Sequence, residues 1–268
     1  MEEREKMNPK DVTIIIPHLG ETKEQEYSFD ECYASLRESA PEIRIVVAKN
    51  GGACHHARDV RVLSQGQCKA VNAGVAITDT PWILITNDDM IYAPGWWEKL
   101  CGFTSFQCVS PLLVEPRPGA PTFETYFCGG AGGDFDKQKF FDFNSKHIGK
   151  GIRTGFNMPL LITRELWDLV GGYDINYDPW GSNSDSDLEY KIKLAGVQSM
   201  QNTDCCVYHF GQTSGTFESQ NREAWQKNWD YFIKKWGFPR TDEGIWEADF
   251  EIPKENIYHP WWEGHYES

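Results

Sequence analysis

Short apolar runs alternate with amphipathic segments over the first hundred residues of the chain. Runs of this length, bounded by proline, glycine and asparagine, are typical of buried strands. They predict strands at Val12–Pro17, Ile43–Ala48, Val60–Leu63 and Trp82–Thr86. Between them we expect a helix that opens with a capping box at Ser28–Glu31 and runs to about Ser39, and another from Cys68 to Val75. This alternation indicates an α/β fold with a mostly parallel, doubly wound central sheet flanked by helices.

The second half of the chain departs from this regular alternation. From Glu115 to about Arg153 it is rich in proline, glycine and aromatic residues, which predicts a long functional loop. Beyond it we expect strands at Met158–Ile162 and Cys205–Phe210, and helices at Arg164–Val170 and from Ser184 to Gly196. In a last helix, ending at Gly237, one stripe holds Trp225, Trp229, Phe232 and Trp236, a pattern that favours core packing. Neither a repeat nor a convincing linker divides the chain, so we expect one domain over residues 1–268.

Composition excludes several classes of protein. With 40% hydrophobic residues the chain is a folded globular protein, and no apolar stretch approaches the length of a membrane span. The charged segment Met1–Lys6 lacks the apolar core of a secretion signal, and eight cysteines without zinc-site spacing suggest reduced, buried thiols, so we expect a cytoplasmic protein. The net charge of −14 argues against nucleic acid or an anionic membrane surface as the main partner.

Two adjacent carboxylates, Asp88 and Asp89, directly follow the predicted strand at Trp82–Thr86. Open α/β sheets bind their ligands at the carboxyl ends of strands. Clustered carboxylates are costly there unless a cation is bound, and a divalent cation bridging to a phosphate meets that need. The alternative is a solvated Asn-Asp-Asp turn.

Two later polar segments also have two interpretations each. The segment Ser184–Asp187 is a good helix N-cap with acids in the first turn, and such a terminus is also a rigid place for a catalytic base. His209, at the end of a predicted strand, is either a structural, hydrogen-bonded histidine or a metal ligand.

The order of these segments resembles the GT-A fold glycosyltransferases, in particular the inverting family 2 type, from about Val12 to Gly237. Asn87-Asp88-Asp89-Met90 looks like the family's Asp-x-Asp motif. The other segments that carry the resemblance are Val12–Pro17, Asn72–Val75, Gly171-Gly172-Tyr173-Asp174 (similar to Gly-Gly-Phe-Asp), Asp185-Ser186-Asp187-Leu188 (similar to Glu-Asp-x-Asp-Leu) and Val207-Tyr208-His209. These matches, in the right order along the chain, are together far more specific than any one of them.

The resemblance implies a sugar transfer from a nucleotide-sugar donor to an acceptor hydroxyl with inversion, where the acceptor is a glycan, a lipid-linked molecule, a protein or a small molecule. It implies a divalent cofactor, Mn²⁺ or Mg²⁺, with Asp89 and His209 as ligands, and Asp185 as the general base. The residues implied to bind the nucleotide sugar are Pro17, His18, Asn50, Gln67, Asn72 and Asp88, where Asp88 holds the ribose or the metal's water shell. Those implied to bind the acceptor are Asp178, Trp180, Gly181 and Asp187, of which Asp187 is also the second candidate for the base.

The resemblance also divides the domain into a nucleotide-sugar half at about 10–110, an acceptor half at about 111–237 and a tail at 238–268. Three positions depart from the family's pattern. Lys49 stands where an acid commonly reads the uracil ring, and an ammonium group only donates hydrogen bonds, so the donor nucleotide is open. Ser184 replaces a common Glu, and His18-Leu19-Gly20 replaces the usual polar residues.

Two other functions remain as alternatives. A nucleotidyltransferase shares the acid at the sheet edge, but it is expected to carry a glycine-rich, basic loop after the first strand, unlike Pro17-His18-Leu19-Gly20-Glu21. A catalytically silent carbohydrate- or nucleotide-binding module is compatible with the departures at Lys49 and Ser184. The oligomeric state is not indicated by the sequence.

Overall fold

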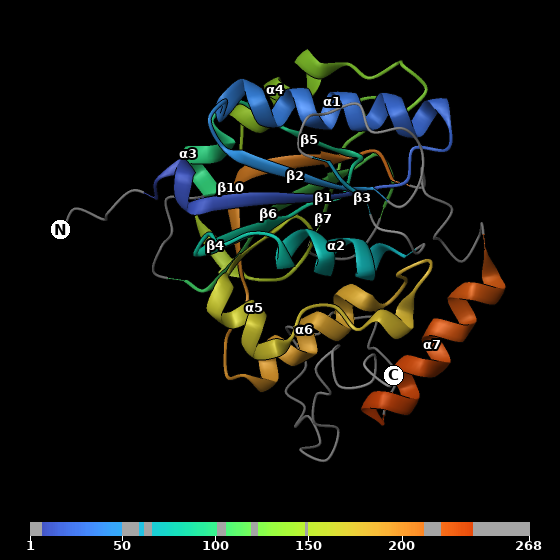
Figure 1. Cartoon of the computed structure of the whole chain (residues 1–268). Coiled ribbons are helices and arrows are strands. Elements are labelled where there is room, and N and C mark those ends of the chain that lie inside the picture. Colours follow the sequence, from blue (N-terminus) through green and yellow to red (C-terminus); the bar gives the residue numbers. More distant parts are fainter. Residues whose placement is uncertain are drawn as a thin grey trace.

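The computed structural model describes residues 7–49, 59–61, 66–100, 106–118, 123–147, 150–211 and 221–237, and of 59–61 only the backbone. Within these ranges ten strands form a single sheet, which lies between two layers of helices (Figure 1). The predicted α/β fold is thereby confirmed.

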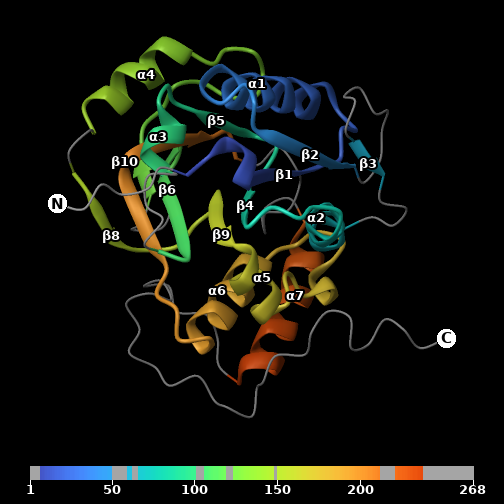
Figure 2. The same ribbon diagram turned by 60° about the vertical axis from the view of Figure 1, so that its left-hand side comes forward.

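The amino-terminal half of the sheet is parallel. β1 (Val12–His18) lies between β2 (Arg44–Lys49) and β4 (Trp82–Ile85), and β3 (Asp59–Arg61) pairs with the outer edge of β2. β9 (Leu160–Thr163) then runs antiparallel to both β4 and β6 (Cys108–Glu115), and β10 (Met200–His209) is parallel to β6. Three short strands complete the sheet: β5 (Met90–Tyr92) and β8 (Ile152–Thr154) pair with β10 (Figure 2), and β7 (Phe123–Thr125) pairs with β6.

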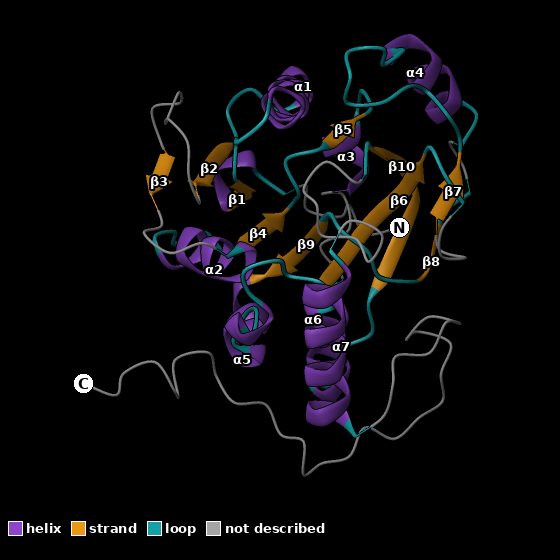
Figure 3. Ribbon diagram, turned by 90° about the vertical axis from the view of Figure 1, so that its right-hand side faces the viewer, coloured by secondary structure: helices purple, strands orange, loops and turns teal. Residues whose placement is uncertain are grey.

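Helices cover both faces of the sheet. α1 (Lys23–Ser39) and α4 (Lys137–Ser145) lie on one face, and α2 (Gln67–Ala76), α5 (Arg164–Val170) and α6 (Ser184–Leu194) lie on the other (Figure 3). The remaining helical elements are η1 (Pro9–Asp11), α3 (Trp96–Leu100), η2 (Ile175–Tyr177) and α7 (Arg222–Trp236). Among the described helices, none has both the length and the apolar composition that crossing a membrane requires.

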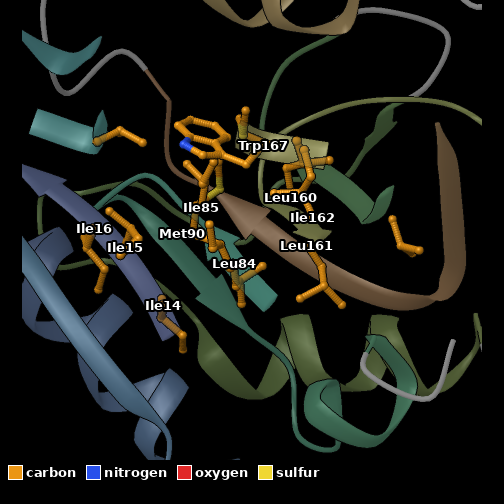
Figure 4. Close-up of a cluster of buried hydrophobic side chains, with 14 of the residues drawn as sticks. Ile14, Ile15, Ile16, Leu84, Ile85, Met90, Leu160, Leu161, Ile162 and Trp167 are labelled. Atoms are coloured by element: carbon orange, nitrogen blue, oxygen red, sulfur yellow. The ribbon is translucent and has the colours of Figure 1, made fainter. Parts of the chain in front are cut away.

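The core explains why the central strands are continuous apolar runs. Because helices cover both faces, side chains of either alternation are buried, and Ile14, Ile15 and Ile16 are all fully buried (Figure 4). The adjacent cysteines of β10 confirm the alternation, since Cys205 packs in the main core cluster and Cys206 in a second cluster on the other side, beneath α4. Both thiols are free and buried, as expected.

The start of α1 was predicted wrongly. The helix begins at Lys23, and its capping box is formed by Thr22 and Gln25: the Thr22 hydroxyl accepts from the Gln25 amide and the Gln25 side chain accepts from the Thr22 amide. Ser28 lies inside the helix, where its hydroxyl donates to backbone carbonyls one turn earlier. Two capping patterns of the same kind stand six residues apart, and the earlier one forms the cap.

The region between Glu115 and Arg153 is not a simple loop. Within its described part lie β7, α4 and β8, and α4 is capped by Asp136, whose carboxylate accepts from the Lys139 amide. Phe140 on α4 is fully buried in the second core cluster against Tyr208 of β10. Several of the aromatic residues of the predicted functional loop thus pack in or against this cluster, namely Phe135, Phe140, Phe141 and Phe143.

Buried charges attach α7 to the rest of the domain. Lys235 Nζ lies 2.7 Å from both Asp174 Oδ2 and Asp187 Oδ1, and the Trp236 indole donates to Asp187 at 2.9 Å. Phe232 and Trp236 are fully buried, which confirms the predicted core role of the stripe for these two residues. Burial by itself raises the pKa of Asp174, but the Lys235 ammonium outweighs burial and lowers this pKa from 3.8 to about 2.

We expect the Asp174 carboxylate to stabilise the fold in a pH-dependent way. Its folded pKa lies below its unfolded value, so its contribution is complete above pH 4 and is lost as the pH falls toward 2; from the size of the shift it amounts to about 2 kcal/mol. Asp174→Asn should be less stable than the parent at pH 7 by roughly this amount, and the difference should vanish near pH 2. Urea unfolding followed by tryptophan fluorescence measures both values.

The matched control is Asp79→Asn, which removes an exposed carboxylate paired with Arg44. A surface pair of this kind contributes little, so this variant should unfold like the parent at every pH. Equal stability of Asp174→Asn and the parent at pH 7 would contradict a stabilising role for the buried pair.

Candidate functional site

Four strands bring their carboxyl ends to one edge of the sheet. β4 is parallel to β1, and β9 is antiparallel to both β4 and β6, so β1, β4, β6 and β10 all run in the same direction. This edge therefore holds His18 at the end of β1, the pair Asp88 and Asp89 after β4, Glu115 at the end of β6 and His209 at the end of β10. Ligands of open α/β sheets bind at this edge.

His209 lies between two carboxylates. Its Nε2 atom is 3.3 Å from Asp89 Oδ1 and its Nδ1 atom is 2.7 Å from Glu115 Oε1. The Phe210 amide donates to the Asp89 carbonyl at 3.1 Å, which fixes the backbone of the acidic turn beside β10. Burial lowers the pKa of His209, but Asp89 and Glu115 outweigh burial and raise it to about 10. The imidazole is thus held as an electrostatic bridge between the two acids.

The same arrangement suits a divalent cation. A metal ion that displaced the proton of Nε2 would find that nitrogen beside Asp89, while Nδ1 stays bonded to the Glu115 carboxylate, which is the carboxylate–histidine–metal pattern. Within the described residues, no group of three or more His, Cys, Asp or Glu side chains is arranged to hold a metal ion. Asp89 and His209 are the pair at this edge that could hold such an ion, with an oxygen and a nitrogen donor of the kinds that suit Mn²⁺.

The side chain of His18 contacts the carboxylate of Asp88. Its Nδ1 atom is 2.7 Å from Asp88 Oδ2, its Nε2 atom is 3.5 Å from Glu26 Oε1, and its ring stacks on Phe29 at 4.2 Å. The imidazole is buried, as is the neighbouring Pro17, and the contact of His18 at this edge is with Asp88 of the acidic turn. Burial, and next the charge of Asp89, raise the pKa of Asp88.

Asp185 lies in the first turn of α6 and is half-buried. Its Oδ1 atom accepts a hydrogen bond of 2.6 Å from the Tyr173 hydroxyl, which also lies 3.8 Å from Met158 Sδ. Met158 shortly precedes β9, whose first residue pairs with Ile85 at the end of β4. This chain of contacts places Asp185 on the side of the sheet edge where the acidic turn lies.

Asp187 has a different environment from Asp185. It is fully buried, and its carboxylate accepts from the Trp236 indole and the Tyr177 hydroxyl and pairs with Lys191 and Lys235. The N-cap of α6 is Asn183, in the left-handed conformation and without a side-chain cap, and not Ser184, whose hydroxyl donates to the Gly181 carbonyl. The structure gives Asp187 a role in holding α6 to α7.

Three residues predicted to bind substrate form contacts between the two halves of the domain. The Asn72 side chain donates to the Tyr173 carbonyl at 2.8 Å and accepts from the Tyr173 amide at 2.9 Å. Asp178 accepts from the Cys68 and Lys69 amides at the start of α2, at 2.9 and 3.1 Å. Gln67 lies against Gly181, where a Cβ atom would come within 2.8 Å of its side chain. Trp180 is half-buried between these contacts and α6.

Three further residues are relevant to the predicted site. Lys49 is buried at the end of β2, in register with His18. Asn50 lies outside the described residues. Glu115 was not predicted as a site residue, because the strand that it ends was not predicted. The sequence signal for it is an acid at the end of the largely apolar segment Cys108–Val114.

Comparison with known proteins agrees with this fold. Residues 13–109 match the model of the family described as Glycosyl transferase family 2. A solved structure described as GalNAc-T7 with UDP, GalNAc and Mn²⁺ has the same fold, with a TM-score of 0.59 and 15% identity over 84% of this chain and 48% of that chain. The match thus spans about half of that chain, and no curated protein sequence matches. Together the family match and the GT-A fold support a domain of the family 2 glycosyltransferase type.

The contact between Glu115 and His209 yields a prediction about metal affinity. Glu115→Gln keeps the shape of the side chain and removes the charge that orients the imidazole. Partners of this kind typically contribute 10- to 100-fold to metal affinity, so we expect Mn²⁺ to bind about that much more weakly. Calorimetric titration with Mn²⁺ alone measures it, and Glu124→Gln on the adjacent strand β7 is the control that loses the same charge. Unchanged affinity of Glu115→Gln would remove His209 from the proposed ligands.

Proposed function

We propose that this GT-A domain of the family 2 type is a metal-dependent, inverting glycosyltransferase. It moves a sugar from a nucleotide-sugar donor to an acceptor hydroxyl. The observation that carries the proposal is the convergence of Asp89 and His209 Nε2 at the carboxyl edge of the sheet, with Glu115 behind the imidazole. In the family resemblance these two residues are the ligands of the metal.

The donor side of the proposed site is built around that metal. Mn²⁺ or Mg²⁺ held by Asp89 and His209 supplies the positive charge that stabilises the departing diphosphate. Asp88, oriented by the 2.7 Å contact to His18, then lies beside the donor's ribose or the metal's water shell. Of the proteins compared, the GalNAc-T7 structure holds UDP and Mn²⁺, which supports this class of donor and cofactor.

On the acceptor side we assign the base to Asp185. Its carboxylate takes the proton of the acceptor hydroxyl while that oxygen forms a bond to the anomeric carbon and the bond from this carbon to the diphosphate oxygen breaks. Attack opposite the leaving group inverts the anomeric configuration. Asp185 is half-buried and accessible, whereas Asp187 is fully buried among lysines and aromatic rings. This difference in burial favours Asp185 over Asp187 as the base.

We place the acceptor against Trp180 and Gly181, which directly precede α6. Trp180 is half-buried, so part of its ring is available to the apolar face of a sugar. Asp178 and Asp187, also considered for this role, are engaged with the amides of α2 and with the lysines near α7. We therefore assign these two carboxylates to holding the acceptor segment in place.

The donor nucleotide is to be identified by binding. Lys49 is 2% exposed at the end of β2, and its ammonium group cannot accept a hydrogen bond from a base. A thermal-shift panel of UDP-, GDP-, CDP- and dTDP-sugars, each with and without Mn²⁺, identifies the donor as the compound that raises the melting temperature. Stabilisation independent of Mn²⁺ would count against Asp89 and His209 as metal ligands.

The catalytic assignment is tested by Asp185→Asn. Loss of a general base lowers the rate by roughly 10²- to 10⁴-fold, and donor binding should stay unchanged because Asp185 acts on the acceptor. Transfer by the parent, followed by NMR of the product's anomeric proton, should show the inverted configuration. Asp168→Asn, which alters an exposed carboxylate on α5, is the control and should transfer normally.

Three outcomes separate the alternatives. Undiminished transfer by Asp185→Asn would refute the base assignment. A product of retained configuration would refute direct displacement. A parent protein that binds a sugar nucleotide but never turns it over would favour the binding module instead.

A further inference from the structure

The Tyr173 hydroxyl donates to the carboxylate proposed as the base, across 2.6 Å. We infer that Tyr173 is a positioning residue, whose hydroxyl holds the Asp185 carboxylate in the orientation that receives the acceptor's proton. The inference rests on the proposed function and deepens it, because it names the group that controls the base. In the family's Gly-Gly-Phe-Asp segment, to which Gly171–Asp174 is similar, the aromatic ring has no hydroxyl.

The hydroxyl is built into the core rather than placed at the surface. Tyr173 is 1% exposed, and its ring packs edge-on against Trp167 with the centroids 5.7 Å apart. Burial, and next the charge of Asp185, raise the pKa of Tyr173 well above its ordinary value, so the phenol keeps its proton and acts as the donor. A hydroxyl in this position binds one carboxylate oxygen, Oδ1, and thereby fixes the direction of the other, Oδ2.

The backbone of Tyr173 is held as firmly as its ring. Both its amide and its carbonyl are hydrogen-bonded to the side chain of Asn72 on α2, which is buried. Gly172 has φ +67°, and a Cβ atom there would come within 2.7 Å of Asn72 Oδ1 and 2.8 Å of the Trp167 ring. Only glycine meets both conditions. The segments Asn72–Gly74 and Gly171–Tyr173 are therefore held together by these contacts, and the second segment ends at the residue that binds the proposed base.

The attachment of Tyr173 to α2 explains why the Asp185 carboxylate, half-exposed in the first turn of α6, has a defined orientation. A side chain in this position normally exchanges between rotamers, and general-base catalysis requires that it stay within hydrogen-bonding reach of the acceptor. Tyr173 comes from the loop before η2 and Asp185 from α6, so their bond also fixes the distance between the two segments. Positioning by Tyr173 therefore acts on the rate of proton transfer, and not on donor binding.

The test is Tyr173→Phe, which removes one oxygen atom and keeps the buried ring. We expect kcat to fall roughly 10-fold, as for loss of a hydrogen bond to a charged group, while KM for the donor stays within about twofold. The acidic limb of the pH profile of kcat should move up by about one pH unit, because a carboxylate that loses a donor holds its proton more tightly. Tyr231→Phe is the matched control: its hydroxyl donates to Asp174 at 2.8 Å, away from Asp185, and both kcat and the pH profile should match the parent.

The double variant Tyr173→Phe/Asp185→Asn separates positioning from a purely structural effect. If Tyr173 acts through Asp185, the tyrosine change should cause no further loss of the residual transfer of Asp185→Asn. Loss of transfer in Asp185→Asn together with a parental kcat and pH profile in Tyr173→Phe would overturn this inference and leave the proposed function intact. A loss that is additive in the double variant, with no movement of the acidic limb, would also overturn it. Undiminished transfer by Asp185→Asn would instead refute both the base and its positioning.

Discussion

A buried carboxylate is costly unless donors or cations replace the water that it loses, and this constraint governs the whole carboxyl side of the domain. The chain carries a net charge of −14 and still buries acids at its functional edge. Each is compensated by a group from a distant segment. The pairs are Asp88 with His18, Asp89 and Glu115 with His209, Asp178 with the amides of α2, Asp185 with Tyr173, and Asp174 and Asp187 with Lys235.

This compensation ties the acceptor half of the domain to the nucleotide half. Asp178 caps α2 from more than a hundred positions further along the chain, and Asn72 of α2 binds the backbone of Tyr173 in return. Cutting either contact leaves a buried polar group without its partner, which costs more than the contact itself contributes. α2 is thus joined to the segment that carries Tyr173, the partner of Asp185, although about a hundred residues separate them.

The elements that could be predicted are those that follow from local pattern. The strand at β1 is an uninterrupted apolar run, and α5 is bounded by a threonine cap and by Gly171, so both were located within a residue or two. β6 was missed because Pro111 interrupts an otherwise strand-like segment. The partners of Asp178, Asp187 and His209 were beyond prediction, since hydrogen bonds across 49 to 110 positions depend on the assembled fold.

The electrostatics of this edge bear on how a sugar nucleotide would bind there. A diphosphate approaching it meets the carboxylates of Asp88, Asp89 and Glu115, while the nearby imidazoles of His18 and His209 are already engaged with those acids. Two further cations end strands on this side: Lys49 of β2, which is buried, and Arg61 of β3, which is in register with Lys49. A divalent cation that binds with the donor or before it would offset the repulsion from these carboxylates, since such an ion is the largest local charge in a site of this kind. In the proposed reaction, a divalent cation at the Asp89–His209 pair would thus link donor binding to the same acids that repel a bare diphosphate.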